Sequence, residues 1–201
     1  MKTAPKGHKA PLLFTQSSRD RVLIAISWDE RQDKASALQR LTGSHTQHDL
    51  DLSCFVYDSN GAYIDFVGAM AQDAVDETGA IYHSGDDATG EGLGDDESIS
   101  CELAGLPRST TDILFVCEIR SGHLFGDIAD PRMRIADGMT DTNLLEIFMN
   151  GADGADKPAC ILARITRDNR SPTGWSYHAI NDYPPIDDVS DWGGYLTRYL
   201  K

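Results

Sequence analysis

Thirteen residues in the middle of the chain, GDDATGEGLGDDE (85–97), carry six carboxylates and four glycines without a Lys or Arg. Two carboxylates about 4 Å apart repel each other by roughly 4 kcal/mol at an effective dielectric constant of about 20. A compact fold of this segment would therefore need a counter-ion. All of its donor atoms are oxygens, which favours calcium over zinc or copper. The alternative is an acidic surface loop that binds no ion.

A second acidic pattern lies upstream, in HDLDLSCFVYD (48–58). Its apolar residues at positions 50, 52, 54 and 56 share one face of a predicted strand, and Asp49 and Asp51 share the other face. Residues two apart on a strand are about 6.5 Å apart, so one cation could bind between these carboxylates, or each could contribute to a different cation. A solvated strand face is the alternative, but the acidic loop makes a shared metal site the better interpretation.

The acidic loop does not follow the EF-hand pattern. If Asp86 is position 1, Glu97 falls on position 12, but Ala88 and Gly90 occupy positions 3 and 5, and Glu91 replaces the glycine required at position 6. The glycines do not indicate a phosphate-binding loop either, because the segment has no Lys and is strongly negative.

Composition limits the classes of partner. The chain has 201 residues, a net charge of −14 and a pI near 4.6, so direct binding to nucleic acid or anionic lipid is not expected. It has no run of the roughly 20 apolar residues that a membrane span needs. Its four cysteines lie in apolar runs without metal-ligand spacing, as buried thiols in a reducing compartment would. We therefore expect a cytoplasmic protein.

Short strands dominate the predicted secondary structure, and they are rich in Ile, Val, Phe and Tyr. Their spacing predicts an all-β fold, an antiparallel β-sandwich of two packed sheets, with one or two short helices at residues 35–41 and 192–200. We expect one domain over residues 1–201, with its core at about 20–183, an N-terminal extension and a short C-terminal tail. The predicted strands are residues 21–28, 51–57, 62–67, 80–83, 98–103, 112–119, 132–136, 144–149, 159–166 and 175–180.

The order of these motifs resembles the TerD family of bacterial tellurium-resistance and stress proteins. A strand ending in Trp28-Asp29 is followed by DLDLSCFVYD, by the acidic loop, by ILFVCEI (113–119), by Phe125-Gly126 and by a strand containing Met-Arg-Ile (133–135). The resemblance continues to residue 183. One departure is Gly-Ala-Met (68–70), which stands where the family usually has an aromatic residue and Asn.

The resemblance implies a calcium-binding, intracellular β-sandwich that acts in resistance to tellurite or other chemical stress. The metal ligands that the resemblance implies are Asp49, Asp51, Asp86, Asp95, Asp96 and Glu97, with further oxygens from Thr89, Gly90 and Glu91. The all-oxygen set of at least six carboxylates predicts two Ca²⁺ ions. We expect a calcium-dependent sensor or scaffold for protein partners of a stress-response complex, which could be associated with a membrane.

Two other functions remain open at this point. A calcium-bridged membrane-surface module is the first, although the loop tip offers only Leu93 as an apolar contact. A carboxylate-dependent hydrolase is the second, with a paired acid and base as in glycosidases or proton transfer by His48 or His83. The chain has no nucleophile elbow and no H-E-x-x-H motif, so we expect that it is not an enzyme.

Overall fold

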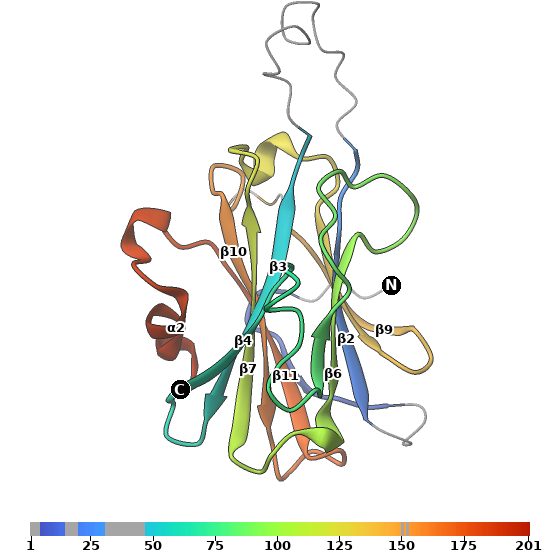
Figure 1. Ribbon diagram of the computed structural model, residues 1–201, viewed down its shortest axis with the longest axis vertical. Helices are drawn as coiled ribbons and strands as arrows, with labels where there is room; N and C mark the ends of the chain where they lie inside the picture. Colours follow the sequence, from blue (N-terminus) through green and yellow to red (C-terminus); the bar gives the residue numbers. More distant parts are fainter. Residues whose placement is uncertain (1–4, 15–19, 31–46, 150, 152) are drawn as a thin grey trace, which may run out of the picture.

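The computed structural model describes residues 5–14, 20–30, 47–149, 151 and 153–201, and these residues form two antiparallel sheets packed face to face (Figure 1). The six-stranded sheet has the order β1 (Lys9–Pro11), β11 (Trp175–Asp182), β10 (Ala159–Arg167), β7 (Thr110–Ile119), β3 (Leu50–Asp58) and β4 (Tyr63–Val67). The five-stranded sheet has the order β5 (Ile81–His83), β6 (Glu97–Glu102), β2 (Arg21–Ser27), β8 (Arg132–Asp137) and β9 (Thr142–Phe148). The predicted all-β sandwich is confirmed.

Short helical segments connect or follow these strands. They are η1 (Leu103–Gly105), η2 (Phe125–Asp127), η3 (Ile186–Asp188), α2 (Trp192–Tyr195) and η4 (Leu196–Tyr199). The helix predicted at residues 192–200 is thus one α-helical turn that continues as a 3₁₀ turn. The helix predicted at residues 35–41 lies outside the described residues. No helix in the described part of the chain is long and apolar enough to cross a membrane.

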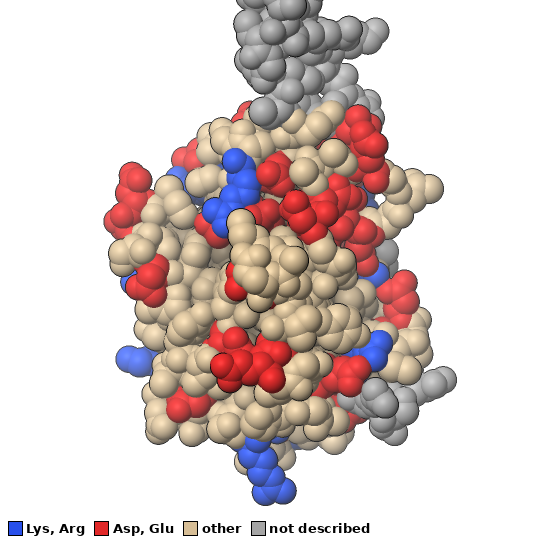
Figure 2. Space-filling model, in the orientation of Figure 1, with Lys and Arg blue, Asp and Glu red and all other residues tan. Residues whose placement is uncertain are grey.

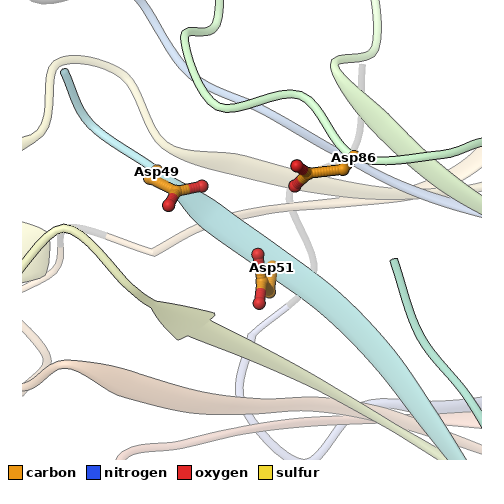
Figure 3. Close-up of side chains that lie close together, drawn as sticks. All are labelled: Asp49, Asp51 and Asp86. Carbon is orange, nitrogen blue, oxygen red and sulfur yellow. The ribbon is translucent and has the colours of Figure 1, made fainter. Parts of the chain in front are cut away.

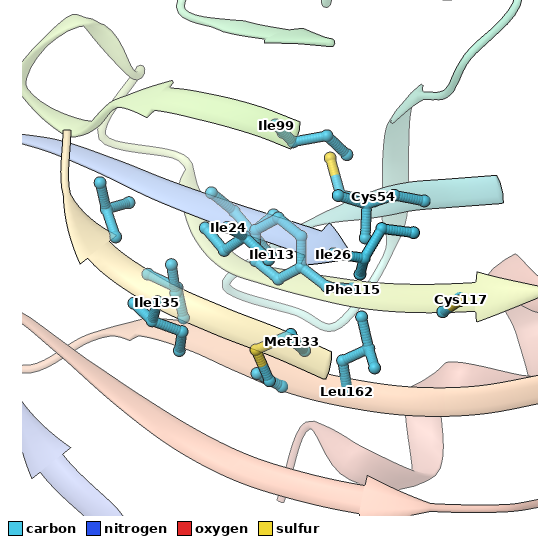
Figure 4. Packing of buried hydrophobic residues seen from close by; sticks show 14 of the residues in the cluster. Ile24, Ile26, Cys54, Ile99, Ile113, Phe115, Cys117, Met133, Ile135 and Leu162 are labelled. Carbon is cyan, nitrogen blue, oxygen red and sulfur yellow. The ribbon is translucent and has the colours of Figure 1, made fainter. Parts of the chain in front are cut away.

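The main core fills the space between the two sheets (Figure 4). β7 is buried on both of its faces over residues 112–117. Ile113, Phe115 and Cys117 point into the space between the sheets, whereas Leu114 and Val116 belong to a second cluster on the outer face of the six-stranded sheet. All four cysteines are buried free thiols, as predicted.

The C-terminal segment covers part of that outer face (Figure 1). Leu196 of η4 is fully buried against the outer cluster. The Tyr57 hydroxyl donates a hydrogen bond to the Gly193 carbonyl at 2.8 Å, and Arg164 Nη1 donates to the Tyr199 carbonyl at 2.9 Å. The same outer cluster includes Ile161 of β10 and Ile180 of β11, so the segment packs over part of these two strands as well.

Candidate metal centre

Three carboxylates from two parts of the fold meet at one end of the sandwich (Figure 3). Asp49 directly precedes β3 and Asp51 lies within it, so the two-residue spacing puts both side chains on the same face of the strand. Asp86 lies in the loop between β5 and β6. One carboxylate oxygen from each residue can be chosen so that the three lie within 4.8 Å of one another. This arrangement could hold a metal ion.

The electrostatics of the cluster are unfavourable without a cation. Burial, followed by the charges of Asp51, Asp86 and Glu97, raises the pKa of Asp49 to about 6, although Arg120 lowers it in part. Asp and Glu side chains also gather on the upper part of the face shown in Figure 2. A bound cation would offset this repulsion and keep Asp49 ionised.

Arg120 places a positive charge beside the three carboxylates, and no pattern in the sequence pointed to it. Its Nε donates to Asp51 Oδ2 at 2.7 Å, and its backbone N–H donates to the Asp49 carbonyl at 2.8 Å. Together with Ala69 and Met70, Arg120 and the three carboxylates line a pocket of about 440 Å³. Arg120 directly follows β7, which pairs with β3, so only knowledge of that pairing would have placed it here.

Asp87 organises the first half of the acidic loop. Its Oδ1 accepts hydrogen bonds from the Thr89 N–H at 2.8 Å, the Thr89 hydroxyl at 2.9 Å and the Gly90 N–H at 3.1 Å. Burial alone would raise the pKa of Asp87, but these hydrogen bonds outweigh it and the pKa is lowered. Gly90 has a φ of +68°, and a Cβ there would lie 2.5 Å from Trp28 Nε1.

Thr89 and Gly90 therefore both donate hydrogen bonds to Asp87. The Glu91 N–H donates a hydrogen bond to the Thr89 hydroxyl at 3.2 Å. Glu91 is not among the carboxylates that lie together with Asp49, Asp51 and Asp86 in the described residues. Metal binding by the oxygens of Thr89 and Gly90 remains a prediction.

Glu97 fastens the end of the loop to the six-stranded sheet. Its side chain is fully buried, and it accepts hydrogen bonds from the Leu52 N–H at 2.8 Å and the Asp87 N–H at 3.2 Å. His83 Nε2 lies 3.3 Å from Glu97 Oε2. His83 Nδ1 accepts from the Gly85 N–H at 2.9 Å, which assigns the ring proton to Nε2. Burial raises the pKa of Glu97.

The remaining two predicted carboxylate ligands make other contacts. Asp95 forms a bidentate ion pair with Arg134, with N–O distances of 2.7 and 2.6 Å. Asp96 Oδ2 accepts from the Trp28 N–H at 2.8 Å. The structure thus brings Asp49, Asp51 and Asp86 together, while Asp95 and Asp96 bond to Arg134 and to the Trp28 backbone. The full ligand set implied by the resemblance remains a prediction.

Comparison with known proteins identifies relatives over most of the chain. The TerD domain family model matches residues 2–183. Tellurium resistance protein TerZ of Serratia marcescens is 32% identical over 132 residues, which are 66% of this chain and 67% of that protein. General stress protein 16U of Bacillus subtilis is 28% identical over 182 residues, which are 87% of this chain and 86% of that protein.

A solved structure shares the fold. It is described as a homologue of telluride resistance protein (TerD) from Streptomyces coelicolor A3(2), and it superposes with a TM-score of 0.64 at 21% sequence identity. The superposition covers 88% of this chain and 98% of that structure. The resemblance noted from the motifs is confirmed.

Proposed function

This chain belongs to the TerD domain family of tellurium-resistance and stress-response proteins, and on that basis we propose that it binds calcium at its three-carboxylate cluster. The observation that carries the proposal is the convergence of Asp49, Asp51 and Asp86 within 4.8 Å in a pocket open to solvent. The carboxylate oxygens come from a strand and from a loop, and calcium accepts such irregular sets of oxygen ligands.

Other divalent metals fit this donor set less well. Zinc and copper favour His and Cys ligands, and the cluster has neither. Magnesium requires near-octahedral geometry and gives up its water reluctantly, so we expect it to compete weakly. We expect two calcium ions in total, and the described cluster supports a position for one of them.

In this proposal calcium makes the protein a sensor or scaffold for protein partners of a stress response in the cytoplasm. Catalysis is not part of the proposal, because Arg120 already pairs with Asp51, one of the three carboxylates that a paired acid and base would use. Tellurium resistance and stress response are what the names of the relatives state.

One observation favours a membrane-surface module as the second candidate. Met70, which lines the pocket, is 67% exposed, and Leu93 in the acidic loop is fully exposed. An exposed apolar side chain at the pocket, such as Met70, could insert between lipids while the ion contacts their phosphates, and Leu93 offers a second apolar side chain in the acidic loop. Co-sedimentation with phosphatidylserine vesicles, with calcium and with chelator, separates the two candidates, because a scaffold for proteins stays in the supernatant in both conditions.

Calorimetric titration tests calcium binding directly. We expect chelator-treated protein to release or absorb heat on adding calcium, and Asp51→Asn or Asp86→Asn to weaken binding at least about tenfold, or about 1.4 kcal/mol. Asp187→Asn is the matched control, because Asp187 is an exposed acid of η3 outside the pocket. An isotherm without heat at millimolar calcium, or equal losses in all three variants, would contradict the proposal.

A further inference from the structure

A second cavity, of about 340 Å³, lies on the outer face of the six-stranded sheet and carries the opposite charge to the rest of the protein. Four Lys or Arg residues and one Asp line it, whereas the whole chain has 18 Lys and Arg against 32 Asp and Glu. The ionisable residues of its lining are Lys9, Arg164, Arg167, Asp168, Arg170 and His178.

Strand pairing produces a row of basic side chains across this cavity. His178 on β11 lies directly opposite Lys9 on β1 and directly opposite Arg164 on β10. Directly opposed residues of neighbouring antiparallel strands have Cβ atoms about 5 Å apart, and like charges at that distance are destabilising. Burial lowers the pKa of His178, and the charges of Lys9 and Arg164 lower it further. The lowered pKa keeps the His178 ring neutral at neutral pH, so the ring lies between two cationic side chains as a neutral group that can donate a hydrogen bond.

Two side chains of the row, Lys9 and His178, could contact a ligand. Within the described residues, neither the Lys9 ammonium nor the His178 ring makes an ion pair or a hydrogen bond. Arg164 is held in place by Asp112 at 2.6 Å and by the Tyr199 carbonyl. Arg164 thus supports the row, and Lys9 and His178 are available to an anion.

The turn after β10 adds a further cation, Arg170, together with one carboxylate, Asp168, whose oxygens already accept hydrogen bonds. Asp168 Oδ1 accepts from the Arg170 N–H at 2.9 Å, and its Oδ2 accepts from the Ser176 hydroxyl at 2.8 Å. The Arg170 side chain is 95% exposed, with its Nε 3.5 Å from Asp168. Arg167 donates to the carbonyls of residues 106, 107 and 110 rather than to a carboxylate.

Protection of the sheet edge explains only part of this cluster. β1 is an edge strand, and Lys and Pro on such a strand prevent pairing with other chains. Lys9 and Pro11 fit that role. It does not require the basic residues on β11, on β10 and in the following turn, which lie inward from the edge.

We propose that this cavity binds the phosphate group of a small soluble molecule, with Lys9, His178 and Arg170 as its direct contacts. A phosphate dianion would be attracted by the charges of Lys9 and Arg170, and it accepts several charge-assisted hydrogen bonds at once. The hydroxyls of Thr166 and Ser176 also line the cavity and supply neutral polar groups. The site is separate from the carboxylate cluster and does not depend on calcium.

Titration with inorganic phosphate and with pyrophosphate, at constant ionic strength and with chelator present, tests the site. We expect saturable binding to the wild-type protein, and losses of at least about fivefold in affinity for Lys9→Gln and for Arg170→Gln, since each removes a charge-assisted contact. Both side chains are exposed, so the variants should fold. In the wild-type protein, NMR signals of the His178 ring should shift as phosphate is added.

Lys6→Gln and Arg198→Gln are the matched controls, because each removes the same charge outside the cavity. Lys6 pairs with Asp182 at 2.9 Å, and Arg198 stacks on Tyr195. The controls should bind phosphate as the wild type does. No saturable binding of either probe, equal losses in controls and cavity variants, or binding only to vesicles of anionic lipid would overturn the proposal.

Discussion

Replacing Asp49 by Asn should stabilise the calcium-free protein although it removes one carboxylate of the cluster. The raised pKa of Asp49, about 6 against an ordinary 3.8, corresponds to roughly 3 kcal/mol of unfavourable free energy for the charged form at neutral pH. Asp49 is only half-buried, and solvent screening reduces this value. We therefore expect about 1 to 2 kcal/mol of stabilisation, or about 3 to 6 °C in Tm for a domain of this size.

Calcium should reverse the benefit of this substitution. A ligand at a hundredfold excess over its Kd stabilises the folded state by about 2.7 kcal/mol. Asp49→Asn removes one of three clustered carboxylates, so we expect at least about tenfold weaker binding and a stabilisation by calcium that is smaller by about 1.4 kcal/mol.

Thermal unfolding of both proteins, in chelator and in excess calcium, measures these two effects together. Asp187→Asn again serves as the control and should behave as the wild type in both solutions. The reasoning would be refuted if Asp49→Asn melted below the wild type in chelator, or if calcium raised the Tm of both proteins equally.

Three further outcomes follow from the same contacts. In chelator, the stability advantage of Asp49→Asn should grow as pH rises from about 4 to 6, because the folded wild type binds more protons than the unfolded chain in that window and loses stability through it; urea titrations whose difference stays constant with pH would exclude this. Glu97→Gln should lower the free energy of unfolding by about 1 to 3 kcal/mol with and without calcium, since one of its two N–H donors would face an amide; an unchanged urea midpoint would show that Glu97 is not structural. Gly90→Ala should lower Tm and weaken calcium binding, because φ is positive and Trp28 occupies the place of the new methyl group; a wild-type melting curve would argue against this packing.

The strands could be predicted from sequence because each carries its own apolar pattern. β3 and β7 are examples, and all ten predicted strands lie within two residues of the observed bounds. β1 was missed because three residues that include Pro11 have no readable period. The sheet order could not be predicted, because it depends on pairing between strands far apart in sequence.

The candidate site could be predicted from the sequence only in part, for the same reason. The two-residue spacing of Asp49 and Asp51 correctly placed both on one face of a strand, and composition alone pointed to Asp86. Carboxylates look alike in sequence, however, and the separate contact of Asp95 with Arg134 depends on the position of β8. The role of Glu97 did leave a signal: it begins the alternation of β6, in which Glu97, Ile99 and Cys101 all face inward.

The carboxylates of the cluster belong to different layers of the sandwich. Asp49 and Asp51 come from the six-stranded sheet, whereas Asp86 is carried by the loop joining two strands of the five-stranded sheet. A cation held by all three would therefore tie one layer to the other at this end. Its loss would allow the two layers to separate locally, while the core between them stays packed. Amide hydrogen exchange should then speed up first in residues 84–96 and at the start of β3, long before the protein unfolds as a whole.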